Sequence, residues 1–362
     1  MMKILYVINS IKNNGPTNVL INMVKNIDKN KFKVNIMTII NENDIELIKL
    51  LKNIGINIIE LNYKKSFWTL FKSKEIIEIV KKEEFDIIHT HCHVPTIMLR
   101  NIDKIKVATV HNRIYEDFKD SYGKIKGTIL SFLYINALKK YDCVVGCSKS
   151  VYEYCKNYIK KIYYVRNGIE SDKKISNEDL RKKYNIPKDA IVYIYAGNLN
   201  YNKDVMGLVD KFDKIHNKNE YLILLGNGIL FDKVKEYEST NIKVIGFVDN
   251  PNIFLNISNV YVSFSKTEGF PISVIEALSN NLLVLLSDIP AHNEFMEIDN
   301  NYYIGEVFNY FNFKNKLLNI RKNLNKEIKS FEFKEKYLSA KDMMKKYQKI
   351  YLGLLQNYKK LK

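Results

Sequence analysis

Short apolar runs alternate with segments of helical periodicity along almost the whole chain. Seven runs in the first half predict β-strands, at Lys3–Asn9, Val34–Ile40, Ile56–Leu61, Asp86–His89, Lys106–Val110, Cys143–Gly146 and Ile162–Val165. Five more follow, at Ile191–Ala196, Tyr221–Leu225, Ile242–Ile245, Val260–Phe264 and Leu283–Ser287. Because strands that alternate with helices form parallel sheets covered on both faces, the pattern predicts an α/β protein with two Rossmann-like, doubly wound domains.

A polar stretch at 167–177 separates the two series of strands. With 362 residues, the chain is long enough for two domains of about 150–180 residues each. We expect an N-terminal domain over 1–168, a C-terminal domain over 169–340, and a basic helix over 341–362 that packs back toward the N-terminal domain. Doubly wound sheets bind ligands at the carboxyl ends of their strands, so we expect the candidate chemistry there.

The segment after Val260–Phe264 combines a loop with the start of a helix. Gly269 permits close approach of the backbone, and Pro271 is suited to the first turn of a helix. Ile272 and Ser273 would then present free backbone N–H groups at the positive end of that helix. The segment therefore predicts an anion site that a diphosphate fits.

Two glutamates belong to the same segment. Glu268 lies in the loop, and Glu276 would lie on the second turn of the helix. One carboxylate could bind the hydroxyl groups of a sugar and the other a ribose. The alternative interpretation is a strand–loop–helix unit that carries two unrelated surface glutamates.

This arrangement resembles the E-x7-E signature of glycosyltransferase family 4. Other segments resemble motifs of that family in the same order along the chain: Val165–Ile169, Ala196–Lys203, Leu225–Gly228, Val244–Val248, and Ser287–Pro290 with Glu294. The resemblance implies the GT-B architecture, in which two Rossmann-like domains face a central cleft. It also implies transfer of a sugar, with retention of anomeric configuration, from a UDP- or GDP-linked donor, with no metal or other cofactor required.

The resemblance carries roles to particular residues. The catalytic residues would be Glu268, which holds the hydroxyls of the donor sugar, and His111, which orients that sugar. Glu276 would bind the ribose and Lys203 the diphosphate, while Asn198 stands where the family usually has an arginine. The remaining donor-binding residues that the resemblance implies are Gly15, Gly246, Phe247, Gly269, Phe270, Pro271, Ile272 and Ser273.

Some of these residues also fit ordinary structural roles. Gly15 lies at a strand-to-helix turn, where glycine is common. Lys203 fits a surface lysine, and His111 fits a structural histidine. These alternatives stay open from the sequence.

Three histidines, His89, His91 and His93, alternate along one segment. Alternation along an extended chain would put them on one face, which suggests a metal site. No carboxylate or fourth ligand is placed nearby, however. The segment also resembles the D-x-x-H-x-H strand end of the family, which favours polar residues beside the cleft, so we expect no metal.

Basic charge is concentrated near the C-terminus. The formal net charge is +17, and residues 314–362 hold 15 Lys and Arg against 4 Asp and Glu. With apolar residues at helical spacing, this stretch predicts a basic amphipathic surface for lipid headgroups or nucleic acid. The alternative is a solvated lysine face. Tyr63–Ser73 is a second basic and aromatic patch that could touch a membrane or pack on the N-terminal sheet.

The chain shows no secretory signal and no run of about 18 apolar residues. We therefore expect a cytoplasmic protein that is peripheral on the inner face of the cell membrane. Its expected acceptor is a glycan or polyprenyl-linked glycan in cell-surface polysaccharide assembly. A sugar-nucleotide epimerase of the same architecture is the main alternative function. A nucleic-acid-binding protein is disfavoured, because no recognisable nucleic-acid module is present.

Overall fold

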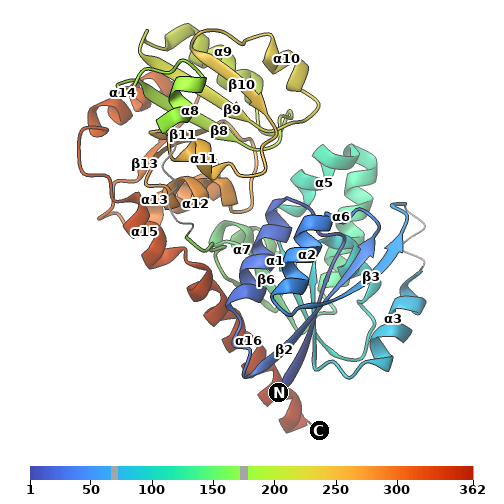
Figure 1. The fold of residues 1–362 in the computed structure, drawn as a ribbon. Helices are drawn as coiled ribbons and strands as arrows, with labels where there is room; N and C mark the ends of the chain where they lie inside the picture. The colour runs from blue at the N-terminus through green and yellow to red at the C-terminus, as the bar shows by residue number, and fades with distance from the viewer. Residues whose placement is uncertain (67–71, 172–177, 362) are drawn as a thin grey trace. The chain divides into compact units, whose positions relative to one another are not determined.

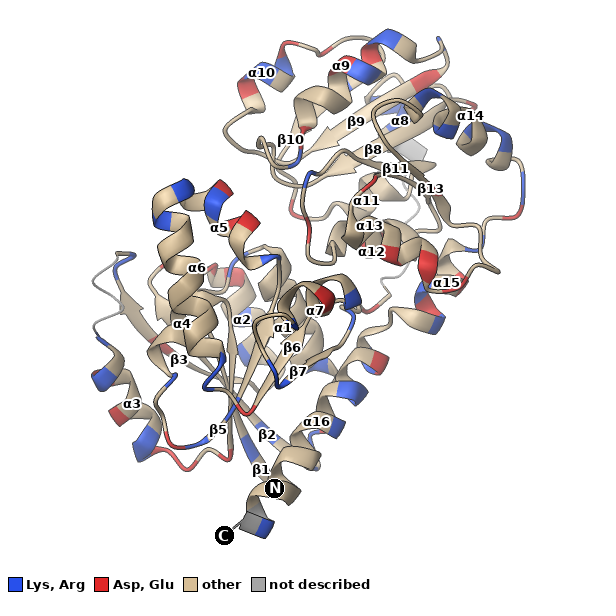
Figure 2. Cartoon of the chain, turned by 180° about the vertical axis from the view of Figure 1, so that it is seen from behind, with Lys and Arg blue, Asp and Glu red and all other residues tan. Residues whose placement is uncertain are grey.

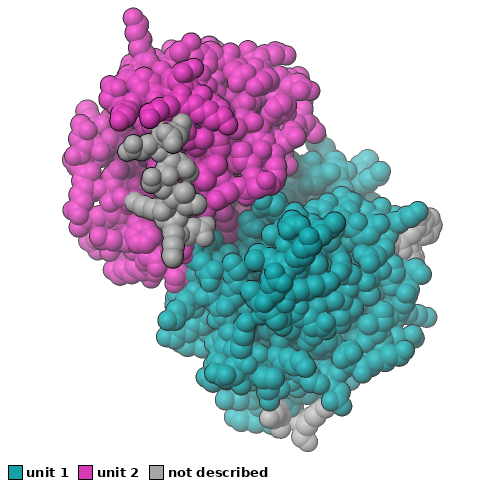
Figure 3. Space-filling view, in the orientation of Figure 1, with its two compact units in different colours: residues 1–170, 340–362 teal, residues 171–339 magenta. Residues whose placement is uncertain are grey.

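The computed structural model describes residues 1–66, 72–171 and 178–361. They form two compact units (Figure 3). Unit 1 contains Met1–Glu170 together with Ala340–Lys362, and unit 2 contains Ser171–Ser339. Parts of the polar stretch 167–177 and of the patch Tyr63–Ser73 lie outside the described residues.

Unit 1 is built on a parallel sheet with the strand order β3-β2-β1-β4-β5-β6-β7 (Figure 1). Its strands are β1 Met2–Ile8, β2 Phe32–Ile40, β3 Asn57–Tyr63, β4 Ile87–His91, β5 Ile105–Val110, β6 Cys143–Gly146 and β7 Ile162–Tyr164. Its helices are α1 Gly15–Asn26, α2 Ile45–Asn53, α3 Ser73–Lys82, α4 His93–Met98, α5 Ile114–Tyr122, α6 Lys124–Leu138 and α7 Lys149–Cys155, with α16 Ala340–Leu361 from the end of the chain. The strand order reverses between β1 and β4, as in a doubly wound sheet.

Unit 2 repeats the plan with the strand order β10-β9-β8-β11-β12-β13. Its strands are β8 Ile191–Ala196, β9 Glu220–Leu225, β10 Ile242–Gly246, β11 Val260–Ser263, β12 Leu283–Ser287 and β13 Gly305–Phe308. Its helices are α8 Glu178–Lys183, α9 Val205–Ile215, α10 Phe231–Lys235, α11 Asn252–Leu255, α12 Ile272–Ser279, α13 Pro290–Glu297, α14 Phe313–Asn323 and α15 Ser330–Tyr337. All the strand pairs of both sheets are parallel.

The predicted α/β class with two doubly wound sheets is confirmed. Each predicted apolar run forms a strand, because a strand inside such a sheet is buried on both faces. Every residue of the central β1 from Ile4 to Ile8 is buried, whereas the edge strand β3 has no buried residue. The prediction missed β13, an edge strand with the sequence Gly-Glu-Val-Phe and one buried residue. A strand this short and this exposed has no apolar run to reveal it.

Helix α16 packs on unit 1 with its apolar face. Met343, Met344, Tyr347 and Tyr351 are all buried, and the helix contacts α1 and β5. The hydroxyl of Tyr351 lies 2.6 Å from Nδ1 of His89 and 3.1 Å from the hydroxyl of Tyr6. Buried polar groups of the sheet thus depend on a helix that follows unit 2 in the chain (Figure 1).

Removal of the Tyr351 hydroxyl tests this dependence. In Tyr351→Phe, both His89 Nδ1 and the Tyr6 hydroxyl lose a buried partner. We expect the free energy of unfolding to fall by about 1–3 kcal/mol, as measured by urea denaturation. Lys349→Gln, on the exposed face of the same helix, is the control and should unfold like the wild type. Equal stability of Tyr351→Phe and wild type would contradict the assigned role.

Candidate active site

Three loops at the carboxyl ends of β8, β9 and β10 are joined by backbone hydrogen bonds. The N–H of Gly226 donates to the carbonyl of Gly246 at 2.7 Å, and the N–H of Leu199 donates to the carbonyl of Asn227 at 2.9 Å. Gly226 has φ +126°, and a Cβ there would lie 1.8 Å from the carbonyl oxygen of Gly197. Only glycine permits this contact, which explains the Leu225–Gly228 motif.

Lys203, in the loop after β8, contacts Glu268, in the loop after β11. The sequence predicts that both residues bind the same donor. The ammonium of Lys203 donates to a carboxylate oxygen of Glu268. The backbone N–H of Lys203 donates to Asn200 Oδ1 at 3.0 Å, and Asn202 Nδ2 donates to the carbonyl of Thr267 at 3.3 Å. The segment Ala196–Lys203 and the E-x7-E segment are therefore joined by side-chain contacts.

Glu268 is a carboxylate in this setting. Burial alone would raise its pKa, but the charge of Lys203 and hydrogen bonds from Lys203 and Ser265 hold that pKa below its ordinary value. The hydroxyl of Ser265 donates to Glu268 Oε1 at 2.8 Å. Glu268 is therefore ionised, with its charge held by two donors.

Helix α12 begins one residue later than predicted. Pro271 is the N-cap residue with an extended backbone (ψ 122°), so it lies before the first turn and not within it. The helix starts at Ile272, and no side chain caps it with a hydrogen bond. Ile272 and Ser273 occupy the first turn, where backbone N–H groups have no acceptor within the helix. An uncapped helix start suits an anion.

Glu276 lies on the second turn of α12, and Glu268 lies in the loop before that helix. Burial is the main reason why the pKa of Tyr261 is raised, and the negative charges of Glu268 and Glu276 raise it further. Both carboxylates therefore lie near the Tyr261 hydroxyl. The hydroxyl of Tyr261 donates to Ser273 Oγ at 2.8 Å. The structure thus brings the two glutamates and the first turn of α12 to one place.

The side chain of Phe270 has a packing role. It is buried, and its ring stacks on Phe295 of α13 with 4.2 Å between the ring centroids. The neighbouring Gly269 is also buried. These two residues therefore fix the loop between Glu268 and α12, and the Phe270 ring is not open to a ligand.

Phe247 and Asn198 are open to solvent at the same edge of the sheet. Phe247 follows β10 and is 60% exposed, so its ring can stack on a planar group such as a nucleobase. Gly246 before it has φ +88°, which favours glycine. Asn198 is exposed, and its carbonyl accepts from the hydroxyl of Tyr195 at 2.9 Å.

His292 belongs to this site and was missed from the sequence. It is fully buried, and its Nδ1 lies 2.9 Å from the carbonyl of Ser287. Burial lowers the pKa of His292 to about 4, although the charge of Glu268 acts in the opposite direction. Its Nε2 has no hydrogen-bond partner among the described residues. The only signal was its place beside Glu294, which is buried as well.

In unit 1, His111 follows β5 and pairs with His91 at the end of β4. His91 Nδ1 lies 2.9 Å from His111 Nε2, and the two rings stack. His91 Nε2 is buried without a partner among the described residues. Because a buried unpaired N–H is rare, we place the His91 proton on Nδ1, which then donates to His111. Burial lowers the pKa of His111 to about 4, so His111 is neutral and carries its proton on Nδ1.

The three histidines of the sequence motif do not share one face, as alternation had suggested. His89 and His91 do, with ring centroids 4.6 Å apart. Strand β4 ends at His91, and His93 begins α4 and packs against Phe118 and other aromatic rings. Among the described residues, no group of three His, Cys, Asp or Glu side chains lies close enough to hold a metal ion.

Gly15 is the first residue of α1. The side chain of Asn14 caps this helix by accepting from the N–H of Thr17 at 3.0 Å. A Cβ at Gly15 would meet no atom within 4 Å, so the fold of unit 1 does not require glycine there.

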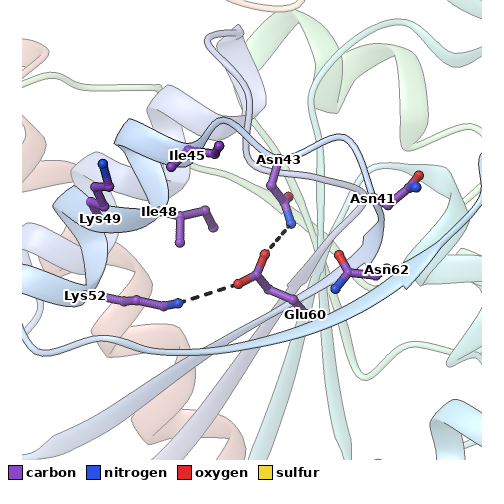
Figure 4. A pocket seen from close by; sticks show the side chains of 8 residues that line it. All are labelled: Asn41, Asn43, Ile45, Ile48, Lys49, Lys52, Glu60 and Asn62. Atoms are coloured by element: carbon purple, nitrogen blue, oxygen red, sulfur yellow. Dashed lines mark hydrogen bonds and ion pairs between the residues drawn. The ribbon is translucent and has the colours of Figure 1, made fainter.

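A polar pocket of about 400 Å³ lies between α2 and the ends of β2 and β3 (Figure 4). It is lined by Asn41, Asn43, Ile45, Ile48, Lys49, Lys52, Glu60 and Asn62. Asn43 Nδ2 donates to Glu60 at 3.1 Å, and Lys52 lies 3.6 Å from the same carboxylate. Amide, ammonium and carboxylate groups beside aliphatic walls can bind sugar hydroxyls. No motif in the sequence indicated this pocket.

The two sheets, with the Lys203–Glu268 loops, define a sugar transferase of the GT-B type. Two family models match the chain: "Glycosyltransferase Family 4" over residues 13–173 and "Glycosyl transferases group 1" over residues 176–336. The chain belongs to these glycosyltransferases, and the predicted family is confirmed.

Similar proteins include enzymes of bacterial polysaccharide assembly. The chain is 28% identical to the O-antigen biosynthesis glycosyltransferase WclY of Escherichia coli, over 98% of this chain and 99% of that protein. It is 25% identical to the UDP-Gal:alpha-D-GlcNAc-diphosphoundecaprenol alpha-1,3-galactosyltransferase of Escherichia coli, over 83% and 82% of the two proteins. The structure of Anabaena HepE in complex with UDP-glucose shares the fold, with a TM-score of 0.78 and 15% identity over 98% and 100% of the chains.

The lowered pKa of His93 predicts that the protein loses stability in mild acid. Burial lowers the pKa of His93 to about 4, whereas the unfolded value is about 6.5. Between these values the unfolded state binds a proton and the folded state does not. The contribution of His93 to stability is therefore full above pH 6.5 and lost as the pH falls toward 4.

His93→Phe isolates this effect, because phenylalanine keeps the ring contacts and cannot titrate. Between pH 7 and pH 5, we expect the variant to lose about 2 kcal/mol less unfolding free energy than the wild type in urea denaturation. Equal losses in the two proteins would contradict a folded pKa this low.

Proposed function

We propose that this glycosyltransferase moves a sugar from a UDP- or GDP-linked donor to a glycan or polyprenyl-linked glycan, with retention of anomeric configuration, in cell-surface polysaccharide assembly. The observation that carries the proposal is the contact between Lys203 and Glu268 in unit 2. It joins a cation for the diphosphate to a carboxylate for the sugar, beside the uncapped start of α12.

In this proposal the diphosphate takes its charge compensation from the protein. The ammonium of Lys203 has three N–H donors, so it can bind a phosphate oxygen while it keeps Glu268. The N–H groups of Ile272 and Ser273 and the amide of Asn198 add further donors. These groups stabilise the leaving diphosphate as its charge develops, so the proposal requires no metal. Asn198 donates without the bidentate geometry of an arginine, which makes Lys203 the main cation.

The other donor groups have separate partners. Glu268 accepts from the hydroxyls of the donor sugar, and Glu276 accepts from the ribose. Phe247, which is exposed after β10, packs on the nucleobase. We assign His111 the role that the family resemblance implies, which is to orient the sugar. Its neutral imidazole donates from Nδ1 and adds no charge that would oppose a cationic sugar in the transition state.

The acceptor is proposed from the relatives. WclY is named for O-antigen biosynthesis, and the galactosyltransferase relative is named for an acceptor on diphosphoundecaprenol. Among the described residues, no helix combines the length and apolar character needed to cross a bilayer. We propose that the enzyme reaches a polyprenyl-linked acceptor through a surface that binds the anionic inner face of the membrane.

Calorimetric titration with a panel of nucleoside diphosphates and nucleotide sugars tests the donor site. We expect the wild type to bind a UDP- or GDP-linked sugar, and Lys203→Ala and Glu276→Ala each to weaken it about tenfold or more, because each removes a charged hydrogen-bond partner. Lys214→Ala, which removes an exposed lysine of α9, is the control and should bind like the wild type. Absence of binding to every nucleotide would refute the proposal.

The stereochemistry of the product tests the reaction. With the donor identified, NMR coupling constants of the new linkage should show the anomeric configuration of the donor sugar. An inverted linkage would contradict the retaining mechanism, but it would still agree with sugar transfer. Conversion of the donor to another nucleotide sugar, without consumption of acceptor, would show an epimerase instead.

A further inference from the structure

Helix α6 carries an apolar stripe that faces solvent. Ile125, Ile129 and Phe132 are 79%, 56% and 62% exposed, and Leu133 is 38% exposed. These residues are spaced at i, i+4, i+7 and i+8, so they lie along one side of the helix. We call these four residues the α6 stripe.

The opposite side of α6 packs into unit 1. Gly127, Ser131, Tyr134 and Leu138 are buried and follow the same helical spacing. A Cβ at Gly127 would lie 2.4 Å from the carbonyl oxygen of Phe118, so α6 lies directly against α5. Helix α6 is thus apolar on both sides, whereas a helix at the surface of a globular protein normally has a polar outer side. The packing of unit 1 does not need the stripe, and exposed apolar patches mark interaction surfaces.

Lysines lie at both ends of the stripe. Lys124 and Lys126 flank Ile125 in the first turn of α6, Lys139 and Lys140 directly follow the helix, and all four are exposed. The helix itself carries no acidic residue. Among the described residues, no carboxylate forms a salt bridge with Lys124, Lys126 or Lys139. The exposed acidic residue nearest to α6 along the sequence is Asp120, which lies on the preceding α5. Apolar side chains between cationic groups complement the acyl region and the negative headgroups of an anionic bilayer.

The C-terminal helix α16 offers charge without such a stripe. It carries exposed Lys341, Lys345, Lys346 and Lys349, and Figure 2 shows basic residues along its length, whereas α6 is uncharged over most of its length. The apolar residues at helical spacing in the basic C-terminal stretch include Met344, Tyr347 and Tyr351, and these are buried in unit 1. They cannot insert into a bilayer while unit 1 is folded.

We propose that α6 is the surface by which this enzyme docks on an anionic lipid bilayer, with the stripe among the acyl chains and the flanking lysines at the headgroup phosphates. This inference rests on the proposed function, in which the acceptor is bound to a membrane lipid. Helix α5 begins three residues after His111, and α6 follows it directly. Docking through α6 therefore anchors the segment that follows His111 at the surface where that acceptor lies.

Vesicle flotation tests the docking surface without the need for catalysis. The wild type should float with vesicles of phosphatidylglycerol and phosphatidylcholine, and poorly with phosphatidylcholine alone. Ile129→Ser/Phe132→Ser should bind the anionic vesicles about tenfold or more weakly, because two large apolar groups no longer leave water. Lys345→Gln/Lys349→Gln on α16 is the matched surface variant, and its binding should stay within about twofold, since these lysines lie outside the stripe.

A tryptophan probe then reports insertion. Trp68 is the single tryptophan of the chain, so Phe132→Trp in a Trp68→Phe background gives one emitter at the stripe. Its emission should shift to the blue with anionic vesicles and be quenched by brominated acyl chains. Emission that stays unchanged while the protein floats would overturn the inference, because binding would then be electrostatic and without insertion.

Two further outcomes would also overturn it. Equal loss of flotation in the α6 and α16 variants would indicate diffuse attraction by the net charge. A dimer of the wild type that becomes a monomer in the α6 variant, with no flotation of either, would make the stripe an interface between two copies. Binding of nucleotides by calorimetry is measured separately in each variant. Failure of flotation with intact donor binding therefore rejects the docking surface and leaves the proposed donor site in place.

Discussion

Parallel strands bring all their carboxyl ends to one edge of a sheet, and this constraint decides where chemistry can lie in both units of the molecule. In unit 2, that edge receives the loops after β8, β9, β10 and β11, and with them Lys203, Phe247 and Glu268. In unit 1, it receives His91 and His111, at the end of β4 and just after β5. Residues far apart in the chain meet because their strands are neighbours. Glycine makes the contact close: at Gly226, any side chain would strike the backbone of the adjoining loop.

The ion pair of Lys203 and Glu268 places two opposite charges at the carboxyl edge of the sheet in unit 2. Both side chains are largely buried, and a buried pair is costly to break because one charge then stays without its partner. A ligand that offers new oxygens to Lys203 can share the ammonium and avoid that cost. The histidines of the two units are the opposite case. Burial holds the pKa of His111 and of His292 near 4, so both act as neutral hydrogen-bonding groups.

The sequence was a good guide to whatever depends on burial or on a family motif. The central strands were predictable because both their faces are covered. The family resemblance assigned Lys203 and Glu268 to one donor, but the ion pair between them was not predicted. Other features depend on three-dimensional packing. The ring of Phe270 turns inward to Phe295, and Pro271 caps α12 from outside because its ψ is extended. His292 has no motif of its own, and β13 is too exposed to form an apolar run. The α6 stripe was hidden because a helix that is apolar on both sides looks buried.

The position of α16 has a consequence for how the protein is made. During synthesis, the strands of unit 1 emerge first, but the tyrosines that pair with His89, Thr109 and Tyr6 emerge only after all of unit 2. Until then, part of the apolar surface of unit 1 is uncovered, and several of its buried polar groups lack the partners that α16 supplies. Unit 2 is continuous in sequence and can complete its core earlier. The order of folding on the ribosome should therefore be the reverse of the order of the units, with the N-terminal unit closing last.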